Sequence, residues 1–190
     1  MVSASIEQVT VSIVSHGHAS MLENLIPCVL QAEAVGQVLI TLNVPESLVL
    51  PDDPRLQVIH NVSPKGFGAN HNQAFAYAHH DLFVVLNPDV VLPDGQVFVR
   101  LLTHAKQHAA AIVSPMALSR SGQREDNWRR FPTMALLFKK LFGGDGGRYL
   151  TSTDSLAVFP VDWASGFCLG VTRTVYESLR GFDERFFMYY

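Results

Sequence analysis

Short apolar runs alternate with amphipathic stretches along most of the chain. Val9–Ser15, Gln37–Leu42, Leu56–Asn61 and Leu82–Leu86 are mainly apolar and rich in β-branched residues. Runs of this length and composition are typical of strands that are buried on both faces of a sheet. Because helical stretches separate most of these runs, the pattern predicts an α/β fold with a largely parallel central sheet.

The amphipathic stretches predict the helices. Ser20 and Glu23 have the spacing of a capping box, and an apolar face follows them. Pro27 should either kink this helix or mark a later start for it. A second helix is expected to run from the 65–70 loop to about His80. A third should begin at Pro93-Asp94. The apolar faces of the first and third helices comprise Leu22, Leu25, Ile26, Val29 and Leu30, and Val97, Leu101, Leu102 and Ala105.

The pattern becomes less regular after a further expected strand at Ala111–Met116. We expect a hairpin turn at Ser119–Gly122, a basic and aromatic loop, a short apolar helix and a glycine-rich linker before the chain returns to the sheet. A last helix should end with Gly181 at its C′ position. The loop, helix, linker, returning segment and last helix are Trp128–Pro132, Thr133–Phe142, Gly143–Gly147, Phe159–Val171 and Thr174–Leu179. The returning segment is expected to be interrupted at Ser165-Gly166.

Composition narrows the range of functions. The 190 residues are 48% hydrophobic and 16% charged, with a net charge of −3, so nothing indicates a nucleic-acid partner. The two cysteines, Cys28 and Cys168, have no metal-type spacing, and reduced thiols in a cytosolic protein are the expected state. The first residues lack the features of a signal peptide, and no apolar run approaches the roughly 20 residues of a membrane span.

Polar residues follow the predicted strands at the points where they end. Ser15-His16 ends the first strand, Asn43 the second, and Asn87-Pro88-Asp89 the central one. Parallel strands share their carboxyl edge, where open α/β sheets bind ligands. The carboxylate of Asp89 suits Mg²⁺ or Mn²⁺ bound together with a diphosphate. The loop at Gly66–Asn70 precedes a helix N-terminus, whose free N–H groups favour an anion such as phosphate.

Other interpretations have weaker support. Gly66 and Gly68 form only half of a dinucleotide-binding fingerprint, and no P-loop is present. The pairs His16/His18 and His79/His80 lack the neighbouring ligands that a metal site needs. A nucleotidyltransferase would share this layout and metal chemistry, but no basic glycine-rich signature follows the first strand. A membrane-interfacial role for Met134–Phe142 stays open beside that of a docked helix, because basic residues flank it.

Five segments of the chain together resemble a known family. In chain order they are Val11–His18, Asn61–Asn72, Leu86–Asp89, Asp162–Gly166 and Gly181–Tyr189. On these segments the chain is similar to the family 2 inverting glycosyltransferases of GT-A fold, particularly the rhamnosyltransferase-like members, which have them in the same order. The resemblance implies a Rossmann-like nucleotide-binding architecture with a mostly parallel central sheet flanked by helices, and a hexosyltransferase-type enzyme.

The resemblance also implies roles for individual residues. Asn87 and Asp89 stand where the family has its DxD element, so Asp89 is expected to bind the divalent metal, Mg²⁺ or Mn²⁺, on the donor diphosphate. The residues expected to bind the nucleotide sugar are Ser15, His16, Asn43, Gly66, Gly68, Asn70, Asn87 and Asp89. Those expected on the acceptor side are Asp162, Trp163 and Gly166.

The chain departs from the family pattern in two places. Thr41–Val44 stands where members commonly have an Asp-Asn pair. In the family, a Glu-Asp pair that supplies the general base follows the Phe-Phe-Met-Tyr segment, so the base is expected just beyond Tyr190 and no catalytic residue is assigned within the chain. We therefore expect a single GT-A-like domain, residues 1–190, in which 1–116 bind the nucleotide sugar and 117–190 form a partial acceptor-side half, truncated at its C-terminus.

The expected function is transfer of a sugar, with rhamnose as one candidate, from a nucleotide-diphosphate donor to a glycan or lipid-linked acceptor, with inversion and with a divalent metal. The alternative is a catalytically incomplete module that binds a nucleotide sugar or a partner and lacks the general base. No nucleic-acid partner is expected. The expected location is cytoplasmic, and a peripheral contact at the inner face of the membrane is left open. Formation of a homodimer is also left open.

Overall fold

The structure is a computed structural model that describes residues 7–131, 133–134, 138, 141–143 and 158–188. It divides the chain into two compact units. Unit 1 comprises Met1–Val113 and Gly166–Tyr190, and unit 2 comprises Ser114–Ser165. These bounds differ from the two halves expected from the sequence, because the chain returns to the first unit at Gly166. The assignment of a single domain stays a prediction.

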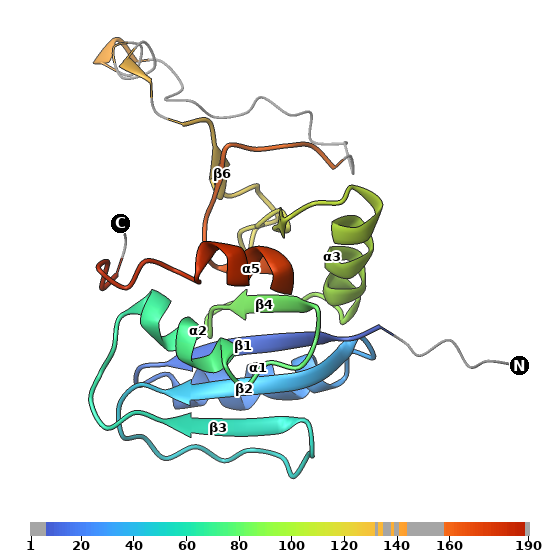
Figure 1. The fold of residues 1–190 in the computed structure, drawn as a ribbon, viewed down its shortest axis with the longest axis vertical. Coiled ribbons are helices and arrows are strands. Elements are labelled where there is room, and N and C mark those ends of the chain that lie inside the picture. Colours follow the sequence, from blue (N-terminus) through green and yellow to red (C-terminus); the bar gives the residue numbers. More distant parts are fainter. Residues whose placement is uncertain (1–6, 132, 135–137, 139–140, 144–157, 189–190) are drawn as a thin grey trace, which may run out of the picture. The chain divides into compact units, whose positions relative to one another are not determined.

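Unit 1 is built on a sheet of six described strands in the order β3-β2-β1-β4-β8-β5 (Figure 1). The pairs β1/β2, β1/β4 and β2/β3 are parallel, whereas β8 runs antiparallel to both β4 and β5. This confirms the predicted α/β class with a mostly parallel sheet. The strands are β1 (Val9–Ser15), β2 (Val35–Leu42), β3 (Leu56–His60), β4 (Leu82–Leu86), β5 (Ile112–Val113) and β8 (Cys168–Thr172).

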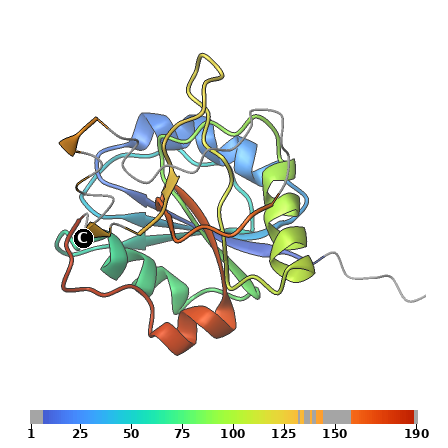
Figure 2. The same cartoon turned by 90° about the horizontal axis from the view of Figure 1, so that it is seen from above.

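Helices cover both faces of this sheet (Figure 2). On one face, α1 (Ala19–Leu30) and α3 (Gln96–Gln107) pack their apolar residues into a core with alternate residues of β1, β2 and β4. On the other face, α2 (Phe67–Phe75) and α5 (Arg173–Leu179) meet around Phe83. The ring of Phe83 lies 5.1 Å from that of Tyr176 and 5.2 Å from that of Phe75. Burial of one such side chain contributes about 1.5–3 kcal/mol.

Two predictions for the first helix concern its N-terminal cap and Pro27. The predicted capping box is wrong, because α1 begins before Ser20 and has His18 as an N-cap without a side-chain hydrogen bond. The hydroxyl of Ser15 instead accepts a hydrogen bond from the backbone N–H of His18, at 3.1 Å. Pro27 lies inside the helix, which continues to Leu30.

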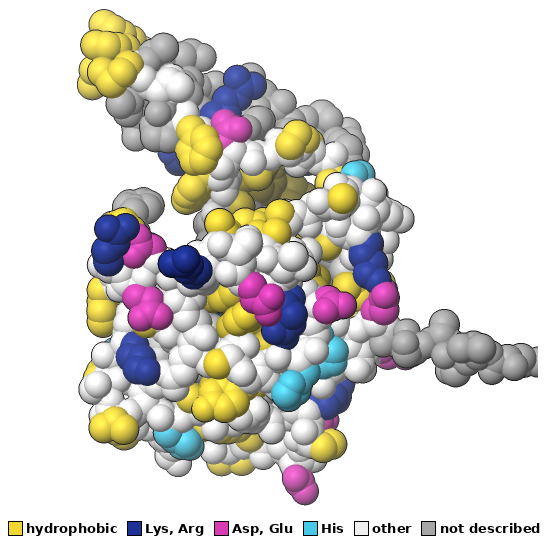
Figure 3. Space-filling model, viewed as in Figure 1, with side chains coloured by type: hydrophobic (Ala, Val, Ile, Leu, Met, Phe, Trp, Pro, Cys, Tyr) yellow, Lys and Arg dark blue, Asp and Glu magenta, His cyan; other side chains and the backbone are white. Residues whose placement is uncertain are grey.

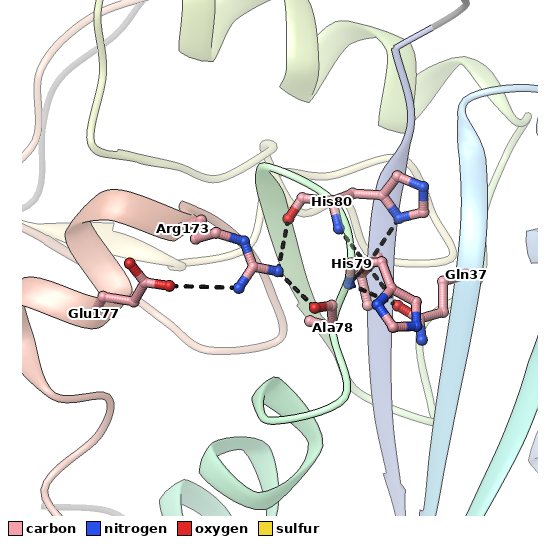
Figure 4. Close-up of polar contacts among 7 residues, drawn as sticks. Gln37, Ala78, His79, His80, Arg173 and Glu177 are labelled. Carbon is pink, nitrogen blue, oxygen red and sulfur yellow. Dashed lines mark hydrogen bonds and ion pairs between the residues drawn. The ribbon is translucent and has the colours of Figure 1, made fainter.

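The second helix is shorter than predicted, because side chains from β2 and α5 bind the chain after Phe75. The amide of Gln37 donates to the carbonyl of Tyr77 (2.8 Å) and accepts from the N–H of His79 (3.0 Å). The guanidinium of Arg173 donates to the carbonyl of Ala78 (2.7 Å) (Figure 4). Hydrogen bonds that would extend a helix are thus replaced by tertiary ones.

The later strands are also shorter than predicted. The segment expected at Ala111–Met116 pairs only at Ile112–Val113. The interruption expected at Ser165-Gly166 is confirmed, since it separates β7 (Trp163–Ala164) in unit 2 from β8 in unit 1. The left-handed conformation expected at the end of the last helix is present at Gly181, and Arg180 before it also has a positive φ.

Unit 2 has little regular structure among its described residues. Strand β6 (Trp128–Arg129) pairs antiparallel with β7. The predicted turn at Ser119–Gly122 is confirmed, since the N–H of Gly122 donates to the carbonyl of Ser119 at 2.9 Å. The predicted helix at Thr133–Phe142 and the linker at Gly143–Gly147 lie largely outside the described residues. Among the described residues, no helix has the length and apolar character needed to cross a membrane.

Candidate functional site

The carboxyl edge of unit 1 brings the predicted strand-end residues together. In the parallel register Ser15 pairs with Leu42 and Ile13 with Leu86, so Ser15, Asn43 and Asn87 leave the sheet at the same edge. The N–H of Asn43 donates to the carbonyl of Ser15 at 2.8 Å. The geometric part of the prediction is therefore confirmed, and the binding roles of these residues stay a prediction.

Asn43 connects three segments at this edge. Its side-chain oxygen accepts from the amide of Asn61 (2.9 Å) and from the backbone N–H of Lys65 (2.8 Å). Its amide nitrogen lies 3.0 Å from both the carbonyl oxygen of Lys65 and Nδ1 of His16. These contacts use the full hydrogen-bonding capacity of one amide, and the residue is only 5% exposed. Asn43 therefore fixes the shape of the edge.

A second asparagine holds the glycine-containing loop. The amide of Asn70, on α2, donates to the carbonyls of Lys65 (3.1 Å) and Gly66 (3.0 Å) and accepts from the amide of Asn61 (2.6 Å). Asn61 thus joins Asn43 to Asn70. Sequence reasoning named Asn43 and Asn70 but missed Asn61, although its place directly after the third strand was a signal for it.

Asp89 presents an exposed carboxylate just beyond the end of β4. Among the described residues, it has no hydrogen-bond or ion-pair partner, and no group of three or more His, Cys, Asp or Glu residues could hold a metal ion. A single free oxygen ligand fits Mg²⁺ or Mn²⁺, since such ions are often held by one or two carboxylates together with water and substrate phosphates.

The structure gives a steric reason for the glycines of the 65–70 loop, whereas the sequence had suggested a bound anion. A Cβ at Gly66 would lie 2.6 Å from the carbonyl oxygen of Phe187, and one at Gly68 would lie 2.6 Å from Cβ of Phe182. The N–H of Phe67, at the start of α2, donates to the carbonyl of Phe187 at 2.8 Å. We call residues 181–188 the C-terminal segment. Because this segment covers the N-terminus of α2, the expectation of wholly free N–H groups for an anion there was wrong.

Asn72 clamps the C-terminal segment to α2, and sequence reasoning missed this role. Its oxygen accepts from the hydroxyl of Tyr176 (2.7 Å) and the N–H of Phe182 (2.8 Å). Its nitrogen donates to the carbonyl of Phe182 and to the carboxylate of Glu184, both at 2.9 Å. Gly181 is required beside it, because φ is +76° and a Cβ would lie 2.2 Å from the Asn72 oxygen.

His71 lies buried beneath this segment. Its Nδ1 lies 2.9 Å from the hydroxyl of Ser12, whereas its Nε2 has no partner. Its ring packs against Phe67 and Phe182, with centroids 4.6 and 6.2 Å away. Burial lowers the pKa of His71 to about 3, so the imidazole is neutral at physiological pH.

The residues predicted for the acceptor side are divided between the units. Asp162 and Trp163 belong to unit 2, where the carboxylate of Asp162 accepts from the N–H of Phe131 at 3.1 Å and Trp163 pairs with Arg129 in the β6/β7 ladder. Gly166 belongs to unit 1, where a Cβ would lie 3.3 Å from the ring of Phe67. Their expected role stays a prediction.

These features define an α/β protein with an exposed carboxylate and a hydrogen-bonded polar loop at the carboxyl edge of a mostly parallel sheet, the edge at which such sheets bind ligands. The model of glycosyl transferase family 2 matches residues 41–165. The chain therefore belongs to glycosyl transferase family 2, which confirms the predicted family and enzyme class.

The chain is also similar to individual proteins whose activity or structure is known. The chain is 24% identical over 193 residues to the rhamnosyltransferase WbbL of Escherichia coli K12, a match that covers 95% of this chain and 72% of WbbL. Its fold is similar to that of the mannosyltransferase PcManGT from Pyrobaculum calidifontis, solved with GDP-Man and Mn²⁺, with a TM-score of 0.64 and 13% identity. That match covers 95% of this chain and 49% of PcManGT.

A second solved structure also has a similar fold. Residues 1–349 of Staphylococcus aureus TarS match with a TM-score of 0.56 and 11% identity, over 93% of this chain and 50% of that one. At these identities the two structures show the fold alone, which is the GT-A fold. The chain spans about half the length of each of these two structures.

Proposed function

We propose that the chain provides the donor-binding part of an inverting glycosyltransferase that moves a sugar, with rhamnose as the first candidate, from a nucleoside diphosphate to a glycan or lipid-linked acceptor. The observation that carries the proposal is the free carboxylate of Asp89 at the carboxyl edge of β4, in a chain of glycosyl transferase family 2. The match to WbbL supports rhamnose, and the complex of PcManGT supports a nucleotide-sugar donor.

The proposed chemistry is in-line displacement. The acceptor hydroxyl gives its proton to a general base, which is not assigned among the described residues, and its oxygen attacks the anomeric carbon, while the bond to the nucleoside diphosphate breaks with inversion and the diphosphate leaves with the bonding electrons. Asp89 is the residue that would hold Mg²⁺ or Mn²⁺, and such an ion would neutralise the charge on the leaving diphosphate. Asn43, Asn61 and Asn70 keep the loop at residues 65–66 in one position beside this edge.

A donor-binding module without transfer activity is the second candidate, and the C-terminal segment supplies an observation for it. Hydrogen bonds from the Arg185 guanidinium lower the pKa of Asp183 to about 2. Glu184 is bound to the amide of Asn72. A carboxylate with so low a pKa is a poor general base near neutral pH, so Asp183 is not suited to activating the acceptor.

Calorimetry with UDP-, dTDP- and GDP-sugars, each with Mn²⁺ or with a chelator, tests the donor site. We expect saturable binding of one nucleotide class that needs the metal and is lost in Asp89→Ala. Glu33→Gln, which removes an exposed carboxylate from the turn before β2, is the matched control and should bind normally. Binding by no donor, or equal binding by Asp89→Ala, would refute the proposal.

A transfer assay then separates the two candidates. Release of nucleoside diphosphate that depends on an added acceptor supports the transferase. Saturable donor binding without release supports the binding module.

A further inference from the structure

Two histidines lie one turn apart at the C-terminal end of α3. His104 is in the last turn of the helix and His108 is its C-cap residue. This i, i+4 spacing brings two side chains to the same face of a helix. The centroids of the two imidazole rings are 5.9 Å apart, and the ring planes are inclined by 35°. The rings are therefore neighbours in space.

This pair lies at the edge of the sheet opposite to the candidate donor site. Helix α3 follows the carboxyl end of β4 and leads back to β5. Ile112, four residues after His108, pairs with Val171, which in turn pairs with Phe83 near the start of β4. The pair is therefore separate from Asp89 and from the asparagines that hold the loop at residues 65–66.

The ring nitrogens of this pair are not used within the described part of the chain. His108 is exposed, and neither imidazole has a hydrogen-bond partner among the described residues. Nδ1 of His104 is buried, so Nε2 is the nitrogen that can reach a ligand. By contrast, His16, His18 and His80 each have a ring nitrogen within hydrogen-bond distance of another group of the chain.

The end of the helix holds the two residues in register. The N–H of His108 donates to the carbonyl of His104 at 3.1 Å. Ala109 then turns the chain with a φ of +45°, and its N–H donates to the carbonyl of Lys106 at 3.2 Å. The last carbonyls of a helix carry partial negative charge, which favours a cation near this end.

The basic side chains near the pair are matched by acidic ones. Lys106 forms an ion pair with Glu7, and Arg100 forms one with Asp94 at 3.0 Å. Figure 3 shows basic and acidic side chains together at the surface over α3. Lys106 is two positions from either histidine, so its side chain does not share their face. Repulsion of a cation by these residues is therefore reduced.

The imidazole ligands define the class of ion. Imidazole suits Zn²⁺, Ni²⁺ and Cu²⁺, whereas carboxylate and phosphate oxygens suit Mg²⁺ and Mn²⁺. A tetrahedral ion with Zn–N bonds of about 2.0–2.1 Å holds two ring centres roughly 5 Å apart. Rotation of the exposed ring of His108 is enough to reach that separation. Among the described residues the pair belongs to no group of three or more His, Cys, Asp or Glu, so water would complete the coordination.

We propose that His104 and His108 bind a divalent transition-metal ion, namely Zn²⁺, Ni²⁺ or Cu²⁺, through Nε2 of His104 and a ring nitrogen of His108. The ion joins the last turn of α3 to its C-cap, because the two ligands share a face only while the helix is formed. The proposal does not depend on glycosyl transfer, since no residue of the donor edge takes part.

Calorimetry with the full chain and no nucleotide tests this site. We expect saturable binding of one ion of Zn²⁺, Ni²⁺ or Cu²⁺ per chain, tightest for Cu²⁺, and no binding of Mg²⁺ by the pair. His104→Gln and His108→Gln should each weaken the affinity at least about tenfold, because even the loss of an outer-shell partner of a metal ligand costs about 10–100-fold.

Matched variants separate the pair from single histidines. His60→Gln removes an exposed histidine from β3 and should leave the affinity unchanged. In the His108→Gln background, Gln107→His places an imidazole at i+3 from His104, on the same face, and should restore much of the affinity. Lys106→His in that background places it at i+2, on another face, and should not.

Thermal unfolding supplies a second measurement. A metal that binds only the folded chain raises the unfolding temperature, so Ni²⁺ should stabilise the wild type and His60→Gln but neither variant of the pair. A chelator should reverse the effect. The proposal is overturned if the wild type binds none of the three ions. It is also overturned if either variant of the pair keeps the wild-type affinity, or if His60→Gln loses as much affinity as they do.

Discussion

Asn72→Ala is expected to release the C-terminal segment from α2. The substitution removes four hydrogen bonds, to Tyr176, to Glu184 and to both backbone groups of Phe182. The hydroxyl of Tyr176, a residue that is 4% exposed, is left without its partner. A buried polar group that loses its partner costs about 1–3 kcal/mol, and each freed exposed group contributes less. We therefore expect the free energy of unfolding to fall by about 2–3 kcal/mol.

Urea denaturation measures this change through the shift of the midpoint at a constant slope. Asn24→Ala is the matched control. Asn24 also lies within a helix, but its amide is exposed and makes only one local bond, to the carbonyl of Ser20 at 2.8 Å. This control should change the free energy of unfolding by no more than about 0.5 kcal/mol.

Tyr176→Phe makes the test specific. If the hydroxyl of Tyr176 depends on Asn72, the two substitutions together should destabilise the protein by about 1 kcal/mol less than the sum of their separate effects. A loss for Asn72→Ala no greater than that of Asn24→Ala, or strict additivity with Tyr176→Phe, would show that Asn72 does not clamp the segment as argued.

Two other predictions concern the same region. His71 has a pKa of about 3 in the folded protein and about 6.5 when unfolded, so the unfolded chain binds the additional proton first. The stability that His71 contributes is therefore complete above about pH 6.5 and falls by up to about 1.4 kcal/mol per pH unit towards pH 3. His71→Gln should reduce this slope in denaturation series at several pH values, whereas the exposed-site control His60→Gln should keep it. Gly68→Ala places a Cβ 2.6 Å from Cβ of Phe182, which should displace the C-terminal segment from α2. Trypsin should then cleave after Arg185, in this segment, faster than in the wild type. An unchanged cleavage rate would contradict this packing.

The sequence was sufficient to predict the carboxyl edge of the sheet. Ser15, Asn43 and Asn87 follow apolar runs directly, and parallel strands must align such ends. The antiparallel direction of β8 could not be predicted, because an apolar run is the same in either direction. The length of α2 was overestimated for a related reason: the side chains of Gln37 and Arg173 that bind the chain after Phe75 come from distant elements.

The glycines of the 65–70 loop show where local reasoning fails. A glycine near a helix N-terminus has the same local pattern whether a phosphate or another piece of backbone approaches it. Here the approaching group is the C-terminal segment, more than a hundred residues away in sequence. The signal that was available was the second asparagine, Asn72, two positions after Asn70 on α2.

The amides explain how side chains of the chain itself hold the loop at the predicted donor edge. Asn43 must both accept from the N–H of Lys65 and donate to its carbonyl, which a carboxylate could not do. Asn70 binds the same loop from α2, and Asn72, two positions further along that helix, binds the C-terminal segment. One short helix therefore holds the loop on one side and the C-terminal segment on the other. A displacement of α2 must change both together, so a variant that releases the C-terminal segment should also weaken donor binding without any change at Asp89.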